Sequence, residues 1–165
     1  MDAAAFVSAE EYLGTSYSPD REYVDGIVVE REVGERPHSR VQANLIRFLE
    51  QRYPTLFAWP EQRLRTVAGR RWRIPDVCVT LDDPGIDVFH EPPFLCVEIV
   101  SNDDRMSRVL EKLKEYRTLG VRHIWVIDPR LKKAFTYTGA LNEVEGDELT
   151  AGEIRLPLSE VFYRL

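Results

Sequence analysis

The stretch PFLCVEIVSNDDR, residues 93–105, decides how this chain is expected to fold. Its first eight residues are apolar except for Glu98, and this continuous run predicts a strand buried on both faces near the centre of a sheet. The polar residues that follow end the strand. An ionised carboxylate inside a buried strand costs several kcal/mol unless an arginine or a metal ion compensates it. Glu98 therefore belongs either to an ion pair or to a functional site.

Strand and helix patterns surround this stretch. Strands are predicted where β-branched and aromatic residues gather, in residues 21–33, 57–59, 63–67, 71–81, 93–100, 123–129 and 133–139. Helices are predicted from helical spacing of apolar residues in residues 8–15, 37–54 and 107–120, with a short one within 156–165. The order predicts a mixed α/β sandwich in one domain over residues 1–165. Its strand–helix–strand unit from Glu98 to Asp128 is a right-handed crossover if the two strands are parallel.

Local signals mark the ends of these elements. Ser8, followed three residues later by Glu11, has the pattern of a helix N-cap. Asp25-Gly26 predicts a tight turn between two strands of a hairpin. Gly120 is suited to end the helix that precedes it.

The composition bounds the class of protein. The chain has 165 residues, of which 44% are hydrophobic and 30% charged, as expected of one globular domain. No stretch approaches the roughly 20 apolar residues of a membrane span, and the N-terminus lacks the basic region of a signal peptide. A cytoplasmic protein with no membrane partner is expected. Cys78 and Cys96 lie in apolar runs, which favours buried, reduced thiols over a disulfide or a metal pair.

The net charge of −6 argues against a protein that coats nucleic acid through bulk electrostatics. A local basic groove is compatible with this net charge, because basic residues gather in two segments, residues 63–73 and 105–117.

A second carboxylate, Asp76, stands at the start of another apolar run, RIPDVCVTL. Pro75 blocks regular strand pairing just before it, so Asp76 is expected near a sheet edge or a distortion. If the strands that carry Asp76 and Glu98 are neighbours, the two acids meet at one point of the sheet. Like charges that close repel, and a divalent cation is the usual remedy. Magnesium is usually held by few protein oxygens and by several waters. Two acids would provide the protein oxygens.

The helix after Glu98 offers a positive group. At ~100° per residue, its buried face is defined by Met106, Val109, Leu113 and Tyr116. Lys112 lies on the flank of that face and can reach back over the sheet, whereas Lys114 points away to solvent. A cation beside a metal can orient a nucleophilic water or offset charge on a phosphate.

The order of these motifs is similar to that of a known superfamily. PD at Asp76, E at Glu98 in an apolar strand, and Lys112 four residues before Tyr116 resemble the PD-(D/E)XK nucleases, and within them the Uma-type restriction endonucleases. The matching pieces cover most of the chain, namely REYVDGIVV, HSRVQANLIRFL, RIPDVCVTL, FLCVEIVS and EKLKEYRTLGVRHIWVIDP. The resemblance implies an α/β restriction-endonuclease-like fold with helices flanking a mixed central sheet.

One position departs from the superfamily pattern. The usual lysine two residues after the acid is here Val100. The Uma-type group is similar in having lost the strand lysine, which gives its role to Lys112. The resemblance also matches Glu22 to an acid before the first hairpin turn, where it supplies a further metal ligand. It matches His38 to a histidine at the start of the first long helix, with a catalytic or substrate-contacting role.

The resemblance implies metal-dependent hydrolysis of DNA. Asp76 and Glu98, with Glu22, would bind Mg²⁺ or Mn²⁺, and Lys112 would orient the attacking water and offset charge in the transition state. DNA is the expected partner. A homodimer built from the strand and helix ends in residues 133–139 and 156–165 is left open.

Each of these candidate site residues can also have a purely structural role. Glu98 can be neutralised by Arg105 or Arg73, Asp76 can cap a strand, and Lys112 can simply be solvated. Glu22 can face solvent on its hairpin, and His38 can cap its helix. For the whole protein, the alternatives are a nuclease-fold module that binds or assembles without cutting, and a phosphodiesterase that acts on RNA or branched DNA.

Overall fold

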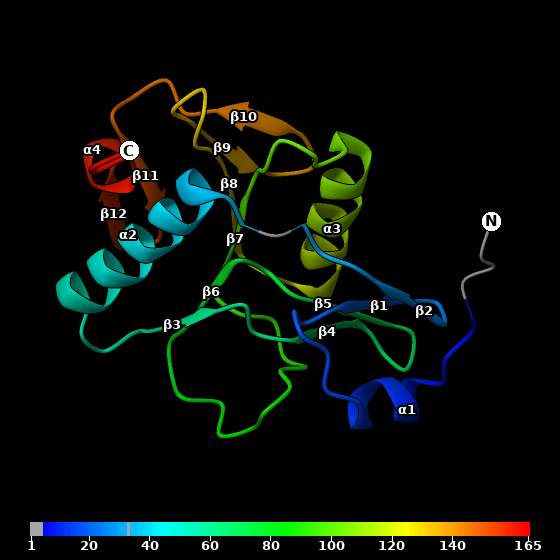
Figure 1. Cartoon of the computed structure of the whole chain (residues 1–165). Helices are drawn as coiled ribbons and strands as arrows, with labels where there is room; N and C mark the ends of the chain where they lie inside the picture. The colour runs from blue at the N-terminus through cyan, green and yellow to red at the C-terminus, as the bar shows by residue number, and fades with distance from the viewer. Residues whose placement is uncertain (1–4, 33) are drawn as a thin grey trace.

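The computed structural model describes residues 5–32 and 34–165 (Figure 1). Val33, the last residue of the predicted segment 21–33, and residues 1–4 of the N-terminus lie outside the described residues. In the described part of the chain, a six-stranded sheet has the order β10-β9-β8-β7-β6-β3. Its strands are β3 (Phe57–Pro60), β6 (Val77–Thr80), β7 (Leu95–Ile99), β8 (His123–Asp128), β9 (Lys133–Tyr137) and β10 (Leu141–Glu143).

This sheet is mixed, as predicted. β7 and β8 are parallel, and the other neighbouring strands are antiparallel. β7 lies inside the sheet and is buried along its whole length. The helix α3 (Met106–Leu119) connects β7 to β8, so the two parallel strands and their helix form the expected strand–helix–strand unit.

A smaller sheet lies beside the first, in the order β2-β1-β5-β4. It consists of the hairpin β1 (Glu22–Val24) and β2 (Ile27–Val29) with β4 (Leu64–Val67) and β5 (Arg71–Arg73). A separate hairpin is formed by β11 (Glu148–Ala151) and β12 (Ile154–Pro157). The remaining helices are α1 (Ala9–Gly14), α2 (Arg36–Arg52) and α4 (Leu158–Val161).

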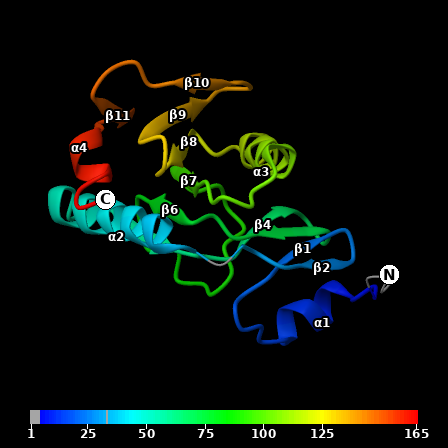
Figure 2. The same ribbon diagram turned by 45° about the horizontal axis from the view of Figure 1, so that its top comes forward.

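The two long helices cover opposite faces of the large sheet (Figures 1 and 2). On the α2 side, Val41, Leu45 and Leu49 pack in one cluster with Val97 and Ile99 of β7. On the α3 side, a second cluster is formed by residues of that helix and of β6, β7 and β8, including Val109, Leu113, Tyr116, Cys78, Cys96, Ile124 and Val126. Because side chains alternate along a strand, Glu98 shares the α3 side with Cys96.

The local signals act as predicted. The Ser8 side chain caps α1 by accepting a hydrogen bond from the Glu11 N–H at 3.1 Å. Asp25 and Gly26 both have positive φ angles, 49° and 91°, which the tight turn between β1 and β2 requires. Gly120 adopts the left-handed conformation, with φ 109°, and ends α3.

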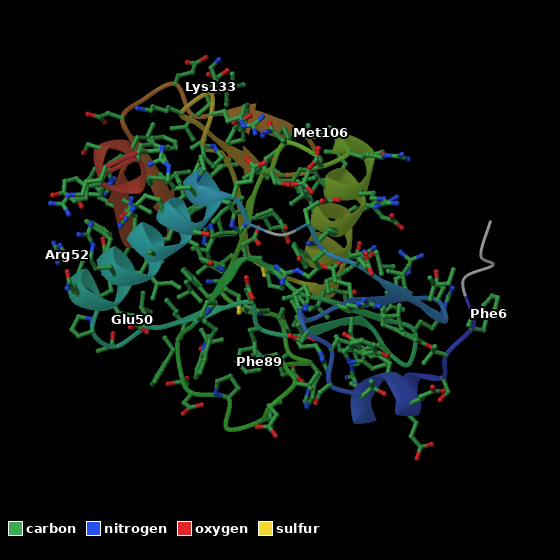
Figure 3. All side chains as sticks on the ribbon, in the orientation of Figure 1. Phe6, Glu50, Arg52, Phe89, Met106 and Lys133 are labelled. Carbon is green, nitrogen blue, oxygen red and sulfur yellow. The ribbon has the colours of Figure 1, made fainter. Side chains whose placement is uncertain are left out.

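Two expectations about elements are wrong. The sequence predicts one strand over residues 71–81, but these residues form β5 in the small sheet and β6 in the large one. The chain passes from one sheet to the other through Ile74–Asp76, where Pro75 has no N–H for a strand ladder. Met106, expected on the buried face of α3, is 50% exposed at the start of that helix (Figure 3).

The last third of the chain holds strands without a strong sequence signal, β10, β11 and β12. None of the described helices has both the length and the apolar character that a membrane crossing needs.

Candidate active site

Asp76 and Glu98 come from neighbouring antiparallel segments. Val77 of β6 pairs with Val97 of β7, so the next step of the same register sets Asp76 opposite Glu98. Asp76 Oδ2 accepts a hydrogen bond from the Ile99 N–H at 2.7 Å, which ties the start of β6 to the end of β7. Both acids are buried, with 5% and 7% of their surface exposed. The structure thus brings the two acids together inside the sheet.

Lys112 reaches Glu98 from α3. Its Nζ lies 2.9 Å from Glu98 Oε2 and 2.9 Å from Glu22 Oε1. Tyr116, one helical turn later, donates its hydroxyl to Glu98 Oε1 at 2.5 Å. The Lys112 side chain is only 14% exposed, consistent with its place on the flank of the helix, whereas Lys114 is exposed. Glu98 is therefore paired with a lysine and hydrogen-bonded to a phenol.

The arginines considered as partners for Glu98 lie elsewhere. Arg73 binds Glu22 and Glu115. In the described part of the chain, Arg105 forms no ion pair. Both arginine readings of Glu98 are therefore wrong.

Glu22 is buried on β1 and faces cations rather than a cavity. Its Oε1 accepts hydrogen bonds from the Ile74 N–H at 3.0 Å and from Lys112, and its Oε2 lies 3.2 Å from a guanidinium nitrogen of Arg73. Glu22 is 4% exposed, so the reading of a solvent-facing hairpin residue is wrong.

His38 and Arg31 share one oxygen of Asp76. His38 Nε2 lies 3.1 Å from Asp76 Oδ1, and a guanidinium nitrogen of Arg31 lies 3.2 Å from the same atom. His38 stands in the first turn of α2, which brings its side chain over the start of β6. Sequence reasoning missed Arg31, because an arginine after a hairpin carries no pattern that separates it from a solvated one.

The charged groups of the site differ in how burial and neighbouring charges shift their pKa values. Burial raises the pKa of Glu98 to about 7, because Lys112 offsets only part of the burial effect and Asp76 and Glu22 add repulsion. Burial alone would raise the pKa of Asp76, but His38 and Lys112 hold it below its usual value. Burial alone would lower the pKa of Lys112, but Glu22, Glu98 and Asp76 raise it. The least stabilised negative charge of the site is therefore on Glu98.

A small cavity of about 80 Å³ opens beside these residues. Asp76, Glu98, Lys112, His38 and Arg31 line it. Its other lining residues include Glu30, Glu32, Ser101, Asp103, Asp104, Arg105 and Arg108, whereas Glu22 is not among them. Pockets for drug-sized molecules span roughly 300–1,000 Å³, so this cavity suits a small group such as a phosphate.

A larger hollow of about 670 Å³ lies at the other ends of β6 and β7. It is lined by Thr80, Leu81, Phe94 and neighbouring loop residues, and it contains none of the acids described above. Of these two cavities, the smaller is the one whose described lining brings buried carboxylates and cations together, so it is the candidate active site.

The donor set of the small cavity fits one kind of metal ion. Among the described residues, no group of three or more His, Cys, Asp or Glu side chains converges as a metal cluster. The carboxylates of Asp76 and Glu98 nevertheless suffice for Mg²⁺, which is usually held by one or two carboxylates and several waters. Glu22 is not placed to hold an ion in this cavity, because it does not line the cavity and instead contacts Lys112, Arg73 and the Ile74 N–H.

Comparisons with known proteins agree with the fold. Among solved structures, the chain is similar to a protein described as a "putative nuclease belonging to DUF820" from Anabaena variabilis ATCC 29413. The two are 19% identical with a TM-score of 0.80, over 94% of this chain and 97% of the other. This likeness confirms the predicted α/β fold class with its mixed central sheet and flanking helices. No match was found among curated proteins.

A family assignment covers nearly the whole chain. Residues 9–163 match the Uma2 family, which is described as "Putative restriction endonuclease". This agrees with the resemblance seen in the order of the sequence motifs. The chain belongs to the Uma2 family.

Proposed function

We propose that the protein is a metal-dependent endonuclease that hydrolyses phosphodiester bonds in DNA. The observation that carries the proposal is the meeting of Asp76, Glu98 and Lys112 at one small cavity. The description of the Uma2 family supports the same reaction class.

Asp76 and Glu98 are the residues that would hold Mg²⁺ or Mn²⁺. When bound, such an ion polarises a phosphate and lowers the pKa of a water molecule. Lys112 supplies a fixed positive charge at the cavity, where it offsets negative charge that develops on the phosphate and orients the attacking water. Its ammonium is held between Glu22 and Glu98, so it needs little rearrangement during the reaction.

The other matched residues act by positioning. Glu22 holds Lys112 and is itself held by Arg73 and the Ile74 N–H. This role replaces the expected one as a metal ligand. His38 contacts Asp76 Oδ1 from α2 and, as a lining residue, lies within reach of a phosphate that enters the cavity.

The test is cleavage of supercoiled plasmid DNA with Mg²⁺, with Mn²⁺ and with a chelator. Wild-type protein is compared with Glu98→Gln and with the matched control Glu153→Gln, an exposed residue in the turn between β11 and β12. We expect metal-dependent nicking by the wild type and by the control, and none by Glu98→Gln. Nicking that persists unchanged in Glu98→Gln removes Glu98 from the mechanism.

A second candidate is a nuclease-fold module that binds nucleic acid without cutting it. It is favoured by the observation that the oxygens of Asp76 and Glu98 already accept hydrogen bonds from protein groups, so their charge is partly compensated internally. Binding without cleavage across duplex DNA, branched DNA and RNA would support it. Cleavage of RNA or of a branched junction alone would identify a phosphodiesterase with a different polymer as its substrate.

A further inference from the structure

A row of basic side chains leads along α3 into the cavity. Arg105 is the N-cap of α3, Arg108 stands in its first turn, and Lys112 follows one turn later. Residues three and four apart lie on the same face of a helix, and all three line the cavity. Lys112 is the buried end of this row, whereas Arg105 and Arg108 are exposed at its mouth.

The guanidinium groups of the two outer arginines have no acidic partner among the described residues. In the part of the chain that the structure describes, neither Arg105 nor Arg108 forms an ion pair, although Asp103 and Asp104 line the same cavity. Asp104 instead accepts a hydrogen bond from the Ser101 N–H at 2.7 Å. A guanidinium presents several donors in a planar fork that matches phosphate oxygens.

A buried hydroxyl points to the same kind of ligand. Ser101 Oγ is hidden from solvent and has no hydrogen-bond partner among the described residues, although Ser101 lines the cavity. Leaving a buried polar atom without a partner costs free energy. A ligand oxygen that accepts this hydrogen bond would remove that cost.

The lining of the cavity favours the backbone of a nucleic acid over its bases. Sequence-tolerant binding of bases relies on stacking against aromatic rings, and no Phe, Tyr or Trp occurs among the described lining residues. With about 80 Å³, the cavity is also far below the roughly 300–1,000 Å³ of typical ligand pockets. Both features fit a phosphate group and leave no stacking platform for a base.

We propose that Arg105, Arg108 and Ser101 form a subsite for the phosphates next to the one that is cut. This inference rests on the proposed function, because it takes a phosphodiester polymer as the substrate. The subsite binds the backbone through charge and one neutral hydrogen bond, and it does not read the sequence.

The test measures binding by fluorescence anisotropy over a range of salt concentrations. Every protein carries Glu98→Gln, so that strands stay intact, and the ligands are duplex DNA of several sequences, single-stranded DNA and RNA. The double variant Arg105→Gln/Arg108→Gln is compared with the matched control Lys114→Gln/Arg117→Gln, which alters two exposed basic residues of α3 outside the cavity lining.

The plot of log K against log salt has a negative slope on duplex DNA. We expect the double variant to make this slope shallower by roughly 0.9 for each phosphate that the protein no longer neutralises. The affinity should fall by the same factor for every sequence, and the control should behave like the parent. Ser101→Ala removes only an uncharged donor, so we expect the affinity to fall by about 2- to 10-fold with an unchanged slope. Thermal melting checks that each variant folds. The three polymers show which backbone the subsite prefers.

Three results would overturn the subsite: an unchanged slope in the double variant, a fall in affinity that depends on the DNA sequence, or no binding of any polymer by the parent. The outcome is separate from that of the cleavage test. If wild-type protein never cuts but the slope falls as expected, the endonuclease proposal fails, and the three residues remain a backbone-binding site of a protein that binds without cutting. If the wild type cuts and the slope is unchanged, only the subsite fails.

Discussion

Two buried ionic clusters meet α3 within one helical turn, and only one of them opens onto a cavity. The closed cluster consists of Glu115 with Arg71, Arg73 and Thr66. The open cluster consists of Lys112 with Glu22, Glu98 and the nearby Asp76. The contact between Glu22 and Arg73 joins them.

The two clusters differ in how their carboxylates are held. In the closed cluster, one buried carboxylate lies between two guanidinium groups, with Glu115 oxygens 2.6 Å from both Arg71 and Arg73. In the open cluster, Glu22 and Glu98 share one lysine, and the nearby Asp76 is paired with Arg31 and His38. A carboxylate that lines a cavity and has the raised pKa of Glu98 is suited to meet a further cation, whereas a carboxylate enclosed by arginines serves to join two parts of a fold. Matched substitutions of Glu98 and Glu115 separate these roles.

The largest effect is expected in the open cluster. Glu98→Gln should lower plasmid cleavage by about 10³-fold or more, because it removes a charged ligand from the site. The free energy of unfolding should stay within about 1 kcal/mol or rise, since the substitution relieves repulsion from Asp76 and Glu22. Cleavage assays and urea denaturation on the same preparations measure both. A variant that loses its fold together with its activity would show that Glu98 is structural.

In the closed cluster, we expect a large effect on stability and little effect on cleavage. Glu115→Gln should lower the free energy of unfolding by about 3 kcal/mol, because it removes the buried carboxylate that binds both arginines and leaves the buried Arg73 with Glu22 as its remaining close acid. Cleavage per folded molecule should stay close to that of the wild type. The matched control is Glu111→Gln, since Glu111 also contacts Arg71 but is 49% exposed. It should cost less than about 1 kcal/mol.

Some elements of the fold could be predicted from the sequence, and others could not. The run of residues 93–100, which is apolar except for Glu98, predicts a central strand, and capping residues such as Ser8 and Gly120 predict helix ends, because these signals are local. The division of residues 71–81 between two sheets was not predictable in the same way. Strand-forming residues stand on both sides of Pro75, and only pairing with distant strands decides which sheet each half joins.

Some residues of the site could likewise be predicted from the sequence, and others could not. Asp76 and Glu98 can be identified from the sequence because acids stand out in apolar runs, and Lys112 because it lies on the flank of the buried helix face and matches the family pattern. Glu115 and Arg31 cannot, because each reads as an ordinary surface residue. Their burial arises only when the small sheet packs against α3 and when the chain after β2 passes over Asp76.

The pH dependence of stability should also come from the closed cluster. Burial alone would raise the pKa of Glu115, but Arg73, Thr66 and Arg71 hold it below its ordinary value of 4.5. A depressed pKa stabilises the fold above the unfolded pKa, and this contribution is lost as the pH falls through the folded pKa. The difference in unfolding free energy between wild type and Glu115→Gln should therefore shrink below about pH 4.5. A difference that stays constant in urea denaturation down to about pH 3 would contradict this assignment.

The smallest effect is expected from the phenol of the open cluster. Tyr116→Phe removes the hydrogen bond to Glu98 and should lower the free energy of unfolding by about 1 kcal/mol. Cleavage should fall by less than about 10-fold, since this bond orients Glu98 without contacting the cavity. A decrease as large as that of Glu98→Gln would mean that Tyr116 takes part in the chemistry itself.

Because Lys112 reaches Glu98 from a helix, the number of residues between them is not fixed by the pleat of a strand. The packing of Val109, Leu113 and Tyr116 against the sheet sets the position of the ammonium. Residues 102–104, which lie between the strand end and the helix, are therefore a place where a change of length would leave the lysine beside its acid. Homologues of this kind would escape a search that requires one spacing between acid and lysine, and they are better recognised by the helix face that carries the cation.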